Sequence, residues 1–438
     1  MHWSNALTPV PMRRVAVVAP ADKVPEVLLA VAETGLVQLD DPATDTPASD
    51  DIAARLERLA FAALRRNDVA AVAGWCPSSD LAALTGRLAS LDASVVVLPS
   101  PPGIDPPTML GDATRLGRAF APLVGTYGVV PYRDLDPAIP AGIAYVAMFG
   151  MMFGDAGHGL LLIAAAALLR SGRPHRLAGL RRMWPFLAGG GVAATVFGVL
   201  YGEFFGPTGV LPVVWLAPLT DPMRLLGAAV TVGAALLGVA YGLGTVNRWR
   251  EGGLRAALYA SSGIAGATVF LGIAAVVAGA LIGVLPLLSA GAAAAVAGLS
   301  LAVIGLFAES GGGATGAAQT GVGAFDLVVR LGSNVVSFAR LAAFGLTHAA
   351  LGAVIWQATT ASAGAGGLGI VAAVVVFTLG NVVAFALEAL IAGVQALRLA
   401  YYELFSRLFV AEGRPFHPLL LSPPPSQRVP IHSLERAS

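Results

Sequence analysis

Residues 327–356 read LVVRLGSNVVSFARLAAFGLTHAALGAVIW, and this segment decides the class of fold. Its 30 residues include three side chains that can carry charge: Arg330, Arg340 and His348. An upright helix needs about 20 apolar residues to cross a bilayer. The segment is therefore predicted to be a membrane-spanning helix that tilts or bends and that buries Arg340 near its middle.

The whole chain has the composition of a membrane protein. Of its 438 residues, 56% are hydrophobic and 12% are charged, whereas soluble domains carry about 25% charged residues. The net charge of +1 gives no support for nucleic-acid binding. A P-loop needs Gly-Lys-Ser/Thr, and the chain's one lysine, Lys23, stands in Ala-Asp-Lys-Val, so we expect no ATP hydrolysis by this chain. Cys76 is the single cysteine, which excludes an internal disulfide and a cysteine-based metal site.

Residues up to about 137 are typical of a soluble α/β domain. Apolar runs predict strands at 15–18, 36–39, 69–75 and 94–98, and helical patterns cover 24–35, 50–67 and 79–91. This order predicts a small N-terminal domain with helices packed against one sheet. No continuous apolar signal sequence precedes it, so we expect a cytoplasmic domain that docks to partners.

From residue 138 onward the chain is a polytopic α-helical membrane protein. Eight apolar stretches follow one another, at 142–153, 159–169, 183–201, 225–246, 256–285, 289–307, 327–356 and 367–409. The first two are short and are separated by GDAGHG at 154–159, so that one long helix and a tight hairpin are both open from length alone.

The distribution of arginine decides between these two alternatives. Loops rich in Arg are cytoplasmic, and one such loop follows the second stretch, with Arg170, Arg173, Arg176, Arg181 and Arg182. An even number of crossings must then precede it, which favours the hairpin. The prediction is eight spans, both termini cytoplasmic, a cytoplasmic domain at 1–137, a membrane domain at 138–412 and a C-terminal tail at 413–438.

Polar residues in the last two stretches recur at helical spacing, three or four residues apart. The seventh stretch carries the stripe Asp326, Arg330, Ser333, Ser337 and Arg340, and the eighth carries Glu388, Ile391, Gln395, Arg398 and Tyr402, of which Ile391 alone is apolar. His348 lies on a face next to the first stripe.

Two polar stripes on tilted helices predict two offset aqueous half-paths for an ion. The arginine between them stays charged and blocks a direct leak. It would also attract a carboxylate on a neighbouring subunit by about 4 kcal/mol at 4 Å and an effective dielectric of 20.

Structural roles are the alternatives for each of these polar residues. Arg398 is close enough to a helix end to snorkel, and Asp155 is an ordinary turn residue. His348 suits an interhelical hydrogen bond, and Asp326 suits a solvated helix start. Glu388 lies well inside its stretch, where a functional role is favoured.

The motifs together resemble the membrane stator subunit of V-type and A-type rotary ATPases, called subunit a or subunit I. The stretches that carry the resemblance are MFGDAGHG at 152–159, YGEFFG at 201–206, SNVVSFARLAAFGLTHA at 333–349, QALRL at 395–399, GRPF at 413–416 and, in the soluble part, GWCP at 74–77.

The resemblance implies a role in ion translocation for seven residues. Arg340 matches the essential stator arginine and Arg398 the second arginine of the family. Glu388 and Gln395 match the outer half-channel, with Asp155 near it, and Asp326 matches the cytoplasmic half-channel. His348 completes this set of candidate residues.

The resemblance also implies partners. They are the ring of c (proteolipid) subunits, the peripheral-stalk and central-stalk subunits and the lipid bilayer. ATP chemistry would take place in other subunits, so we expect no catalytic residue, no cofactor and no metal ligand in this chain.

Two departures from the family pattern stand out. The helix expected at 50–67 would be about 27 Å long at 1.5 Å per residue, much shorter than the family's coiled-coil arm. Ala400 replaces a residue that is commonly polar. The preference for Arg over Lys favours a bacterial plasma membrane.

The sequence leaves several alternatives open. A self-contained secondary transporter or channel and a non-conducting scaffold are the competing functions. The choice of H⁺ or Na⁺ and the direction of turnover are open as well.

Overall fold

The computed structural model describes residues 8–40, 52–110, 115–172, 179–181, 183–408 and 413–421. Three of the arginines used above for topology, Arg173, Arg176 and Arg182, lie outside these residues. The chain forms two compact units. One, here the α/β unit, comprises Pro9–Met109, Val129–Tyr132 and Glu412–Ser438, and the other, the helical unit, comprises Met1–Thr8, Leu110–Gly128 and Arg133–Ala411. The domain limits predicted from the sequence stay predictions.

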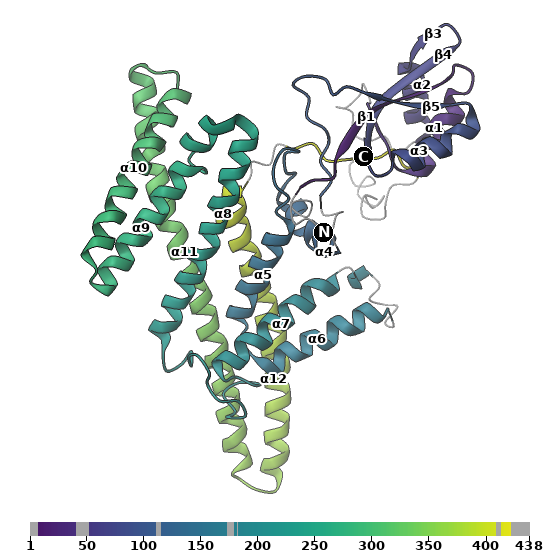
Figure 1. The fold of residues 1–438 in the computed structure, drawn as a ribbon. Coiled ribbons are helices and arrows are strands. Elements are labelled where there is room, and N and C mark those ends of the chain that lie inside the picture. Colours follow the sequence, from purple (N-terminus) through teal and green to yellow (C-terminus); the bar gives the residue numbers. More distant parts are fainter. Residues whose placement is uncertain are drawn as a thin grey trace, which may run out of the picture. The chain divides into compact units, whose positions relative to one another are not determined.

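The α/β unit contains one antiparallel sheet in the order β2-β4-β1-β5, with β3 paired to β4 (Figure 1). Its elements are β1 (Met12–Pro20), α1 (Val24–Thr34), β2 (Gln38–Leu39), α2 (Ile52–Ala62), β3 (Leu64–Arg66), β4 (Val69–Pro77), α3 (Leu81–Leu88), a 3₁₀ turn η2 (Ala89–Leu91) and β5 (Ser94–Leu98).

The core of this unit lies on one face of the sheet. Alternate residues of β1 point inward, and Val17 faces Val72 of β4 in register. Leu28 of α1, Leu59 of α2 and Leu84 of α3 close the same core, so the three helices cover one face, as the pattern of strands and helices predicts. Gly74 lets the backbone of β2 approach, because a Cβ there would lie 2.5 Å from the Gln38 carbonyl oxygen.

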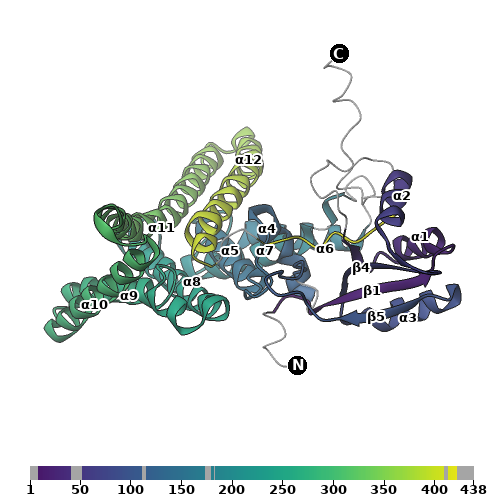
Figure 2. The same cartoon turned by 90° about the horizontal axis from the view of Figure 1, so that it is seen from above.

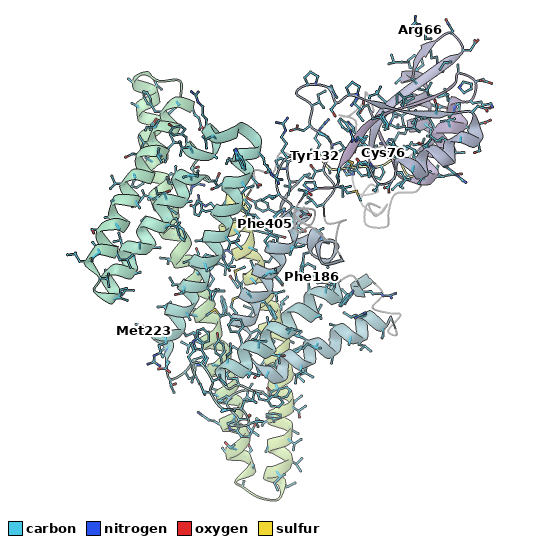
Figure 3. All side chains as sticks on the ribbon, in the orientation of Figure 1. Arg66, Cys76, Tyr132, Phe186, Met223 and Phe405 are labelled. Carbon is cyan, nitrogen blue, oxygen red and sulfur yellow. The ribbon has the colours of Figure 1, made fainter. Side chains whose placement is uncertain are left out.

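The helix predicted at 50–67 is too long. It ends at Ala62, and Leu64–Arg66 forms β3, which pairs with β4 through a two-residue turn at Asn67 and Asp68 (Figure 3 labels Arg66 at the tip). Asn67 has a φ of 55°, a conformation that Asn tolerates well in such turns. The amphipathic pattern continued past the point where the turn chemistry ends the helix, and α2 spans only 11 residues.

The C-terminal segment returns to the α/β unit. The Leu419 side chain is 1% exposed within the core, and its N–H donates to the Val37 carbonyl at 2.9 Å. Earlier in the same segment, Pro415 forms a parallel bridge with Thr108, and the N–H of Gly413 donates to the Val129 carbonyl. The described part of the predicted tail is therefore an integral part of this unit.

The helical unit follows the apolar stretches of the sequence. Its helices are α4 (Arg115–Tyr127), α5 (Ala138–Met152), α6 (Ala156–Ser171), α7 (Trp184–Tyr201), α8 (Pro222–Tyr259), α9 (Ile264–Ile282), α10 (Leu285–Glu309), α11 (Gly313–Ala363), α12 (Leu368–Leu399), the π-helix η4 (Ala400–Phe405) and α13 (Ser406–Leu408).

Each of the eight predicted stretches contains a helix. Among the described residues six helices are long and apolar enough to cross a membrane: α7 to α11, and α12 with its extension to Leu408. These helices mark a multi-pass membrane protein. The shorter α5 and α6 are separate helices that diverge from a short junction and both pack against α7 (Figure 1). Eight crossings therefore stay a prediction.

The fifth stretch was predicted to begin at residue 256, but α8 continues to Tyr259 and α9 begins at Ile264. The backbone of α8 breaks at Gly253, whose φ of 69° only glycine adopts readily. The apolar run hides this boundary because Ala and Leu suit the end of one helix and the start of the next equally well.

The helices α11 and α12 form a long antiparallel pair, side by side in both views (Figures 1 and 2). The two helices span 51 and 32 residues, longer than one upright crossing. This pair carries both polar stripes of the sequence, and the junction of α5 and α6 packs against it.

Candidate functional site

A polar cavity lies along the α11–α12 pair, and we call it the arginine cavity. The Nη1 atom of Arg340, on α11, donates to Oε1 of Gln395, on α12, at 3.4 Å. This distance exceeds the usual 2.7–3.2 Å, so the half-buried guanidinium is held weakly. The cavity measures about 110 Å³ and is lined by Ser337, Arg340, Arg398, Leu399, Tyr402 and Glu403.

The Glu403 carboxylate is the main acidic group near Arg340. It lies on the π-helix, is 7% exposed, and interacts with Ser337 and then with three arginines, Arg407, Arg340 and Arg398. Among the described residues, no carboxylate oxygen lies within 4.0 Å of an Arg340 guanidinium nitrogen. The charge of Arg340 is thus balanced from a distance and is not locked in an ion pair.

Arg398 lies at the open side of the same cavity. The residue is exposed, and its guanidinium carbon lies 5.9 Å from the ring centre of Tyr402, itself 69% exposed. The two arginines predicted from the sequence therefore share one cavity, with Arg340 inside and Arg398 at its rim.

A second polar group lies further along the same helix pair, and we call it the histidine cluster. It consists of Asp155, His158, His348 and Glu388. The Nδ1 atom of His348 on α11 pairs with Oε2 of Glu388 on α12. This contact joins two predicted residues and confirms the interhelical hydrogen bond that the sequence suggested for His348.

Asp155 is a structural acceptor at the centre of the histidine cluster. It is the N-cap of α6, and its Oδ1 accepts from the backbone N–H groups of His158 at 2.9 Å and of Phe205 at 3.0 Å. Its Oδ2 accepts from the N–H of Gly206 at 2.7 Å. These bonds hold the YGEFFG loop, in which Phe205 has a φ of 51° that is costly for a bulky residue.

The glycines of GDAGHG allow close packing in this cluster. A Cβ at Gly157 would lie 2.5 Å from the Phe205 ring, and one at Gly159 would lie 2.4 Å from the Thr195 hydroxyl. On α7, a Cβ at Gly198 would lie 2.1 Å from the Ala156 nitrogen. The motif therefore combines an Asp cap with a surface of small residues that brings α6 and α7 together.

His158 completes the histidine cluster, and aromatic rings enclose it. The imidazole is 3% exposed and stacks on Phe153 at 5.6 Å between ring centres, while Phe205 lies at 5.2 Å and Phe385 at 5.6 Å. Asp155, His158 and His348 each offer a donor atom, and these atoms lie within 4.8 Å of one another. They are the described residues that could hold a metal ion.

The arginine cavity and the histidine cluster lie at different depths on the same pair. His348 follows Arg340 by eight residues on α11, and Glu388 precedes Gln395 by seven on α12. At 1.5 Å per residue both offsets are about 11 Å. The histidine cluster is thus displaced by about two helical turns from the arginine cavity.

Asp326 lies on the opposite side of Arg340, fourteen residues earlier on α11, or about 21 Å. Its carboxylate is half exposed and binds Arg330 at 2.6 Å, one turn along the helix. The structure does not bring Asp326 into either polar group.

Three buried polar residues in or beside these two groups are not among the site residues predicted from the sequence. His158 belongs to a quoted motif but lies on a short helix, outside both stripes. Glu203 is 4% exposed and interacts electrostatically with Asp155, His348 and Glu388. The regular helical repeat placed Tyr402 on the polar stripe. Glu403 is the next residue, and it is the one that is buried in the π-helix.

Comparison with known proteins gives one consistent family. The sequence profile of the V-type ATPase 116kDa subunit family matches residues 54–203 and 324–421. A-type ATP synthase subunit I of Pyrococcus horikoshii is 28% identical over 78% of this chain and 52% of its own length. Subunit I of Aeropyrum pernix is 28% identical over 81% of this chain and 58% of its own length.

A human relative, V-type proton ATPase 116 kDa subunit a 3, is 33% identical over 32% of this chain and 19% of its own length. The chain spans about half the length of the archaeal relatives named above. A bacterial source stays a prediction, because these relatives come from archaea and a eukaryote. Since the family profile covers more than half of the chain, the protein belongs to the V-type ATPase 116kDa subunit family.

Proposed function

We propose that this chain is the membrane stator subunit of a rotary ATPase. In this proposal α11 and α12 face a ring of c subunits, and two half-paths lead H⁺ or Na⁺ to and from that ring. ATP hydrolysis or synthesis takes place in partner subunits joined by central and peripheral stalks.

The observation that carries the proposal is the state of Arg340. The guanidinium is half-buried, contacts the neutral Gln395 weakly and has no carboxylate within ion-pair distance in the described part of the chain. It remains charged at any working pH. Such a cation is available to a carboxylate that moves past it, and it repels a free cation that would otherwise leak through.

An exposed apolar face of α12 supports a protein partner next to this charge. Its members recur every three or four residues, and each is more than half exposed: Leu379, Val383, Leu387, Leu390 and Val394. The next position at this spacing is Arg398, at the rim of the arginine cavity. A face that runs from apolar residues to an arginine suits a ring of apolar helices, each with one carboxylate at membrane depth.

The different depths of the polar groups support two offset half-paths. The histidine cluster lies about 11 Å from Arg340 toward one end of the helix pair, and Asp326 lies about 21 Å away toward the other. In the proposal the histidine cluster belongs to the outer half-path and Asp326 to the cytoplasmic one. Each half-path would end at the ring, on its own side of Arg340.

The return of the C-terminal segment supports an even number of crossings. Leu419 lies in the same core as the N-terminal strands, and in the proposal both ends of the described chain lie on one side of the membrane. With six long helices crossing, α5 and α6 must together contribute two crossings or none. We propose two, with the Asp155 junction at the outer end and the α/β unit in the cytoplasm.

The decisive experiment replaces Arg340 by Lys in the assembled complex and measures ATP-driven ion uptake into vesicles. Lysine retains the charge but loses the planar fork of donors. We expect uptake to fall by about 100-fold while the complex still assembles. The matched control is Arg224→Lys, an exposed arginine at the start of α8.

Normal uptake by assembled Arg340→Lys complexes would refute the stator role and favour a non-conducting scaffold. Ion transport by the purified chain without its partners would favour a self-contained transporter.

Topology has its own test, in a chain whose buried Cys76 is replaced by Ala. A cysteine at Arg176 should react with a membrane-impermeant thiol reagent from the side of the α/β unit, and one at Trp215 from the opposite side. Labelling of both from the same side would refute the proposed arrangement.

A further inference from the structure

The histidine cluster has the donor set of a metal site, and two segments of the chain supply its ligands. Asp155 and His158 come from the start of α6, and His348 comes from α11. Their donor atoms lie within 4.8 Å of one another, and all three residues are buried. Sequence analysis predicted no metal ligand, and His348 follows His158 by 190 positions in the chain.

The ring nitrogens of His158 are buried and only weakly held. Neither meets hydrogen-bond geometry with a described residue; Nδ1 lies 3.8 Å from Oδ1 of Asp155, and the Asn381 side chain interacts with the ring. Leaving a buried polar group unpaired costs about 1–3 kcal/mol. The backbone hydrogen bond to Asp155 and the ring stacked on Phe153 hold His158 in this position. A ligand bound to this imidazole would replace long or weak contacts with a direct bond.

His348 is oriented as metal-binding histidines are. Its Nδ1 pairs with Glu388, which leaves Nε2 as the atom for a ligand. Histidines that bind metals commonly use the other ring nitrogen to contact a carboxylate, which fixes the ring and raises its basicity. The remaining oxygen of Glu388, Oε1, is buried without a partner among the described residues and can accept a bond from a metal-bound water.

Asp155 supplies a fixed carboxylate. Its three backbone hydrogen bonds use two acceptor positions of Oδ1 and one of Oδ2. An ionised carboxylate has about four acceptor positions, so one position of Oδ2 remains. The third ligand is therefore an oxygen of a carboxylate that three backbone N–H groups already hold in place.

We propose that Asp155, His158 and His348 bind a Zn²⁺-class divalent cation, with Glu388 orienting His348 and water completing the coordination. Two imidazoles and one carboxylate suit Zn²⁺, whereas Mg²⁺ and Ca²⁺ prefer oxygen ligands. Bonds of 2.0–2.1 Å in a tetrahedron place ligand atoms about 3.3 Å apart. Because the ligand atoms lie within 4.8 Å of one another, no pair would have to approach by more than about 1.5 Å.

The consequence for transport rests on the proposed function. If the histidine cluster belongs to the outer half-path, a bound cation holds His348 and Glu388 together and adds a fixed positive charge there. Zn²⁺ applied from the outer side would then inhibit ion uptake. The site would be a point of inhibition by a metal and not a permanent cofactor site.

Binding is tested on the assembled complex in detergent, stripped of metal by a chelator. Co²⁺ serves as the probe, because its visible absorption reports tetrahedral nitrogen and oxygen ligands. We expect one Co²⁺ per chain, displaced by Zn²⁺ and not by excess Mg²⁺. His158→Gln should weaken binding at least about 10-fold, and the control His417→Gln, at an exposed histidine of the α/β unit, should not change it.

His348→Gln is the second variant, in case His158→Gln fails to assemble. Binding of Co²⁺ with unchanged affinity and spectrum in either assembled variant would overturn the proposal. Loss of binding in the control His417→Gln would overturn it as well.

Inhibition is tested separately, with Zn²⁺ added to the outer side and uptake expressed relative to each variant without Zn²⁺. We expect inhibition of the native complex and at least about 10-fold weaker inhibition of His158→Gln. Binding without inhibition would overturn the blocking role while the metal site stands. Absence of binding, together with loss of uptake in Arg340→Lys, would overturn the metal site while the proposed function stands.

Discussion

The arginine cavity and the histidine cluster lie on the same pair of helices but differ in construction. Two helices and the π-helix form the arginine cavity, which is open at Arg398 and holds Arg340 by one long hydrogen bond. The histidine cluster adds the α5–α6 junction and the YGEFFG loop, and three aromatic rings enclose it.

Under the proposed function, this difference matches a cation that meets a moving partner in one group and a fixed carboxylate in the other. A guanidinium that must meet a moving partner gains from weak contacts, since a strong ion pair would have to break at each encounter. A carboxylate that holds a loop gains from backbone N–H donors, which do not move. In the proposed function, two polar groups about 11 Å apart would therefore meet opposite mechanical requirements.

Asp155→Ala gives the largest expected effect and tests the fixed side of the comparison. It removes an acceptor from three buried N–H groups and leaves Phe205 unsupported in its strained conformation. We expect a loss of about 4 kcal/mol in the free energy of unfolding, measured as thermal unfolding in detergent. Asp155→Asn, which keeps one acceptor oxygen, should lose less, and equal losses in both variants would contradict the account.

Arg398→Ala tests the arginine cavity. It compares the arginine at the rim, Arg398, with the arginine in the interior, Arg340. Arg398 is exposed, whereas Arg340 is half-buried against Gln395. We expect uptake to fall about 10-fold in Arg398→Ala, against about 100-fold in Arg340→Lys. Quantitative uptake in vesicles with matched amounts of complex checks this, and equal losses would show that the two arginines act as one unit.

Asp134 extends the comparison with Asp155. Both are buried carboxylates, but backbone N–H groups donate to Asp155 and no described group donates to Asp134. It is fully buried, and neither oxygen accepts a hydrogen bond from a described residue. Burial, and then the nearby Glu251, raise the pKa of Asp134 to about 7, while Arg248 and Arg250 act in the opposite direction. Asp134 lies before α5, outside the membrane-spanning helices.

The sign of the pH effect follows from this raised pKa. The folded protein keeps the proton on Asp134 to higher pH than the unfolded chain does. The stabilisation that comes from this proton is therefore complete below about pH 4, and it is lost as the pH rises through 7. Asp134→Asn should therefore be more stable than the native protein at pH 8, by about 2 kcal/mol. The gap should shrink toward pH 5 in thermal unfolding, and a gap independent of pH would refute the explanation.

Asn67 gives the smallest expected effect, and it tests the energetic cost of a positive φ on its own. Like Phe205, it has a positive φ, but it lies in an exposed hairpin turn of the α/β unit. Asn67→Val should cost about 1 kcal/mol because β-branched residues disfavour this conformation. The control Asn67→Gly should stay within about 0.5 kcal/mol of the native protein. Equal stability of both variants in chemical unfolding would contradict this reading.

Much of the fold could be predicted from periodicity and composition. Strands β1, β4 and β5 and the eight apolar helices lie where the apolar runs predict them. The failures are at boundaries, at Leu64–Arg66 and around Gly253, where local turn chemistry overrides a continuing pattern.

The candidate site could be predicted only in part from the sequence. Helical spacing put Arg340 and Gln395 on polar stripes, and the structure joins them across α11 and α12. The inward position of Glu403 was not predictable, because a π-helix changes the repeat on which the stripe was drawn. The roles of these residues in transport stay predictions.

The sequence by itself determined which segments are helices and which of their faces are polar, because bilayer thickness and the helical repeat act on neighbouring residues. Only the tertiary structure decided that Asp155 and His158 meet His348 and Glu388, and that Leu419 returns to the N-terminal core. These contacts join residues tens to hundreds of positions apart. Shape complementarity between whole helices selects them, and no local pattern in the chain encodes it.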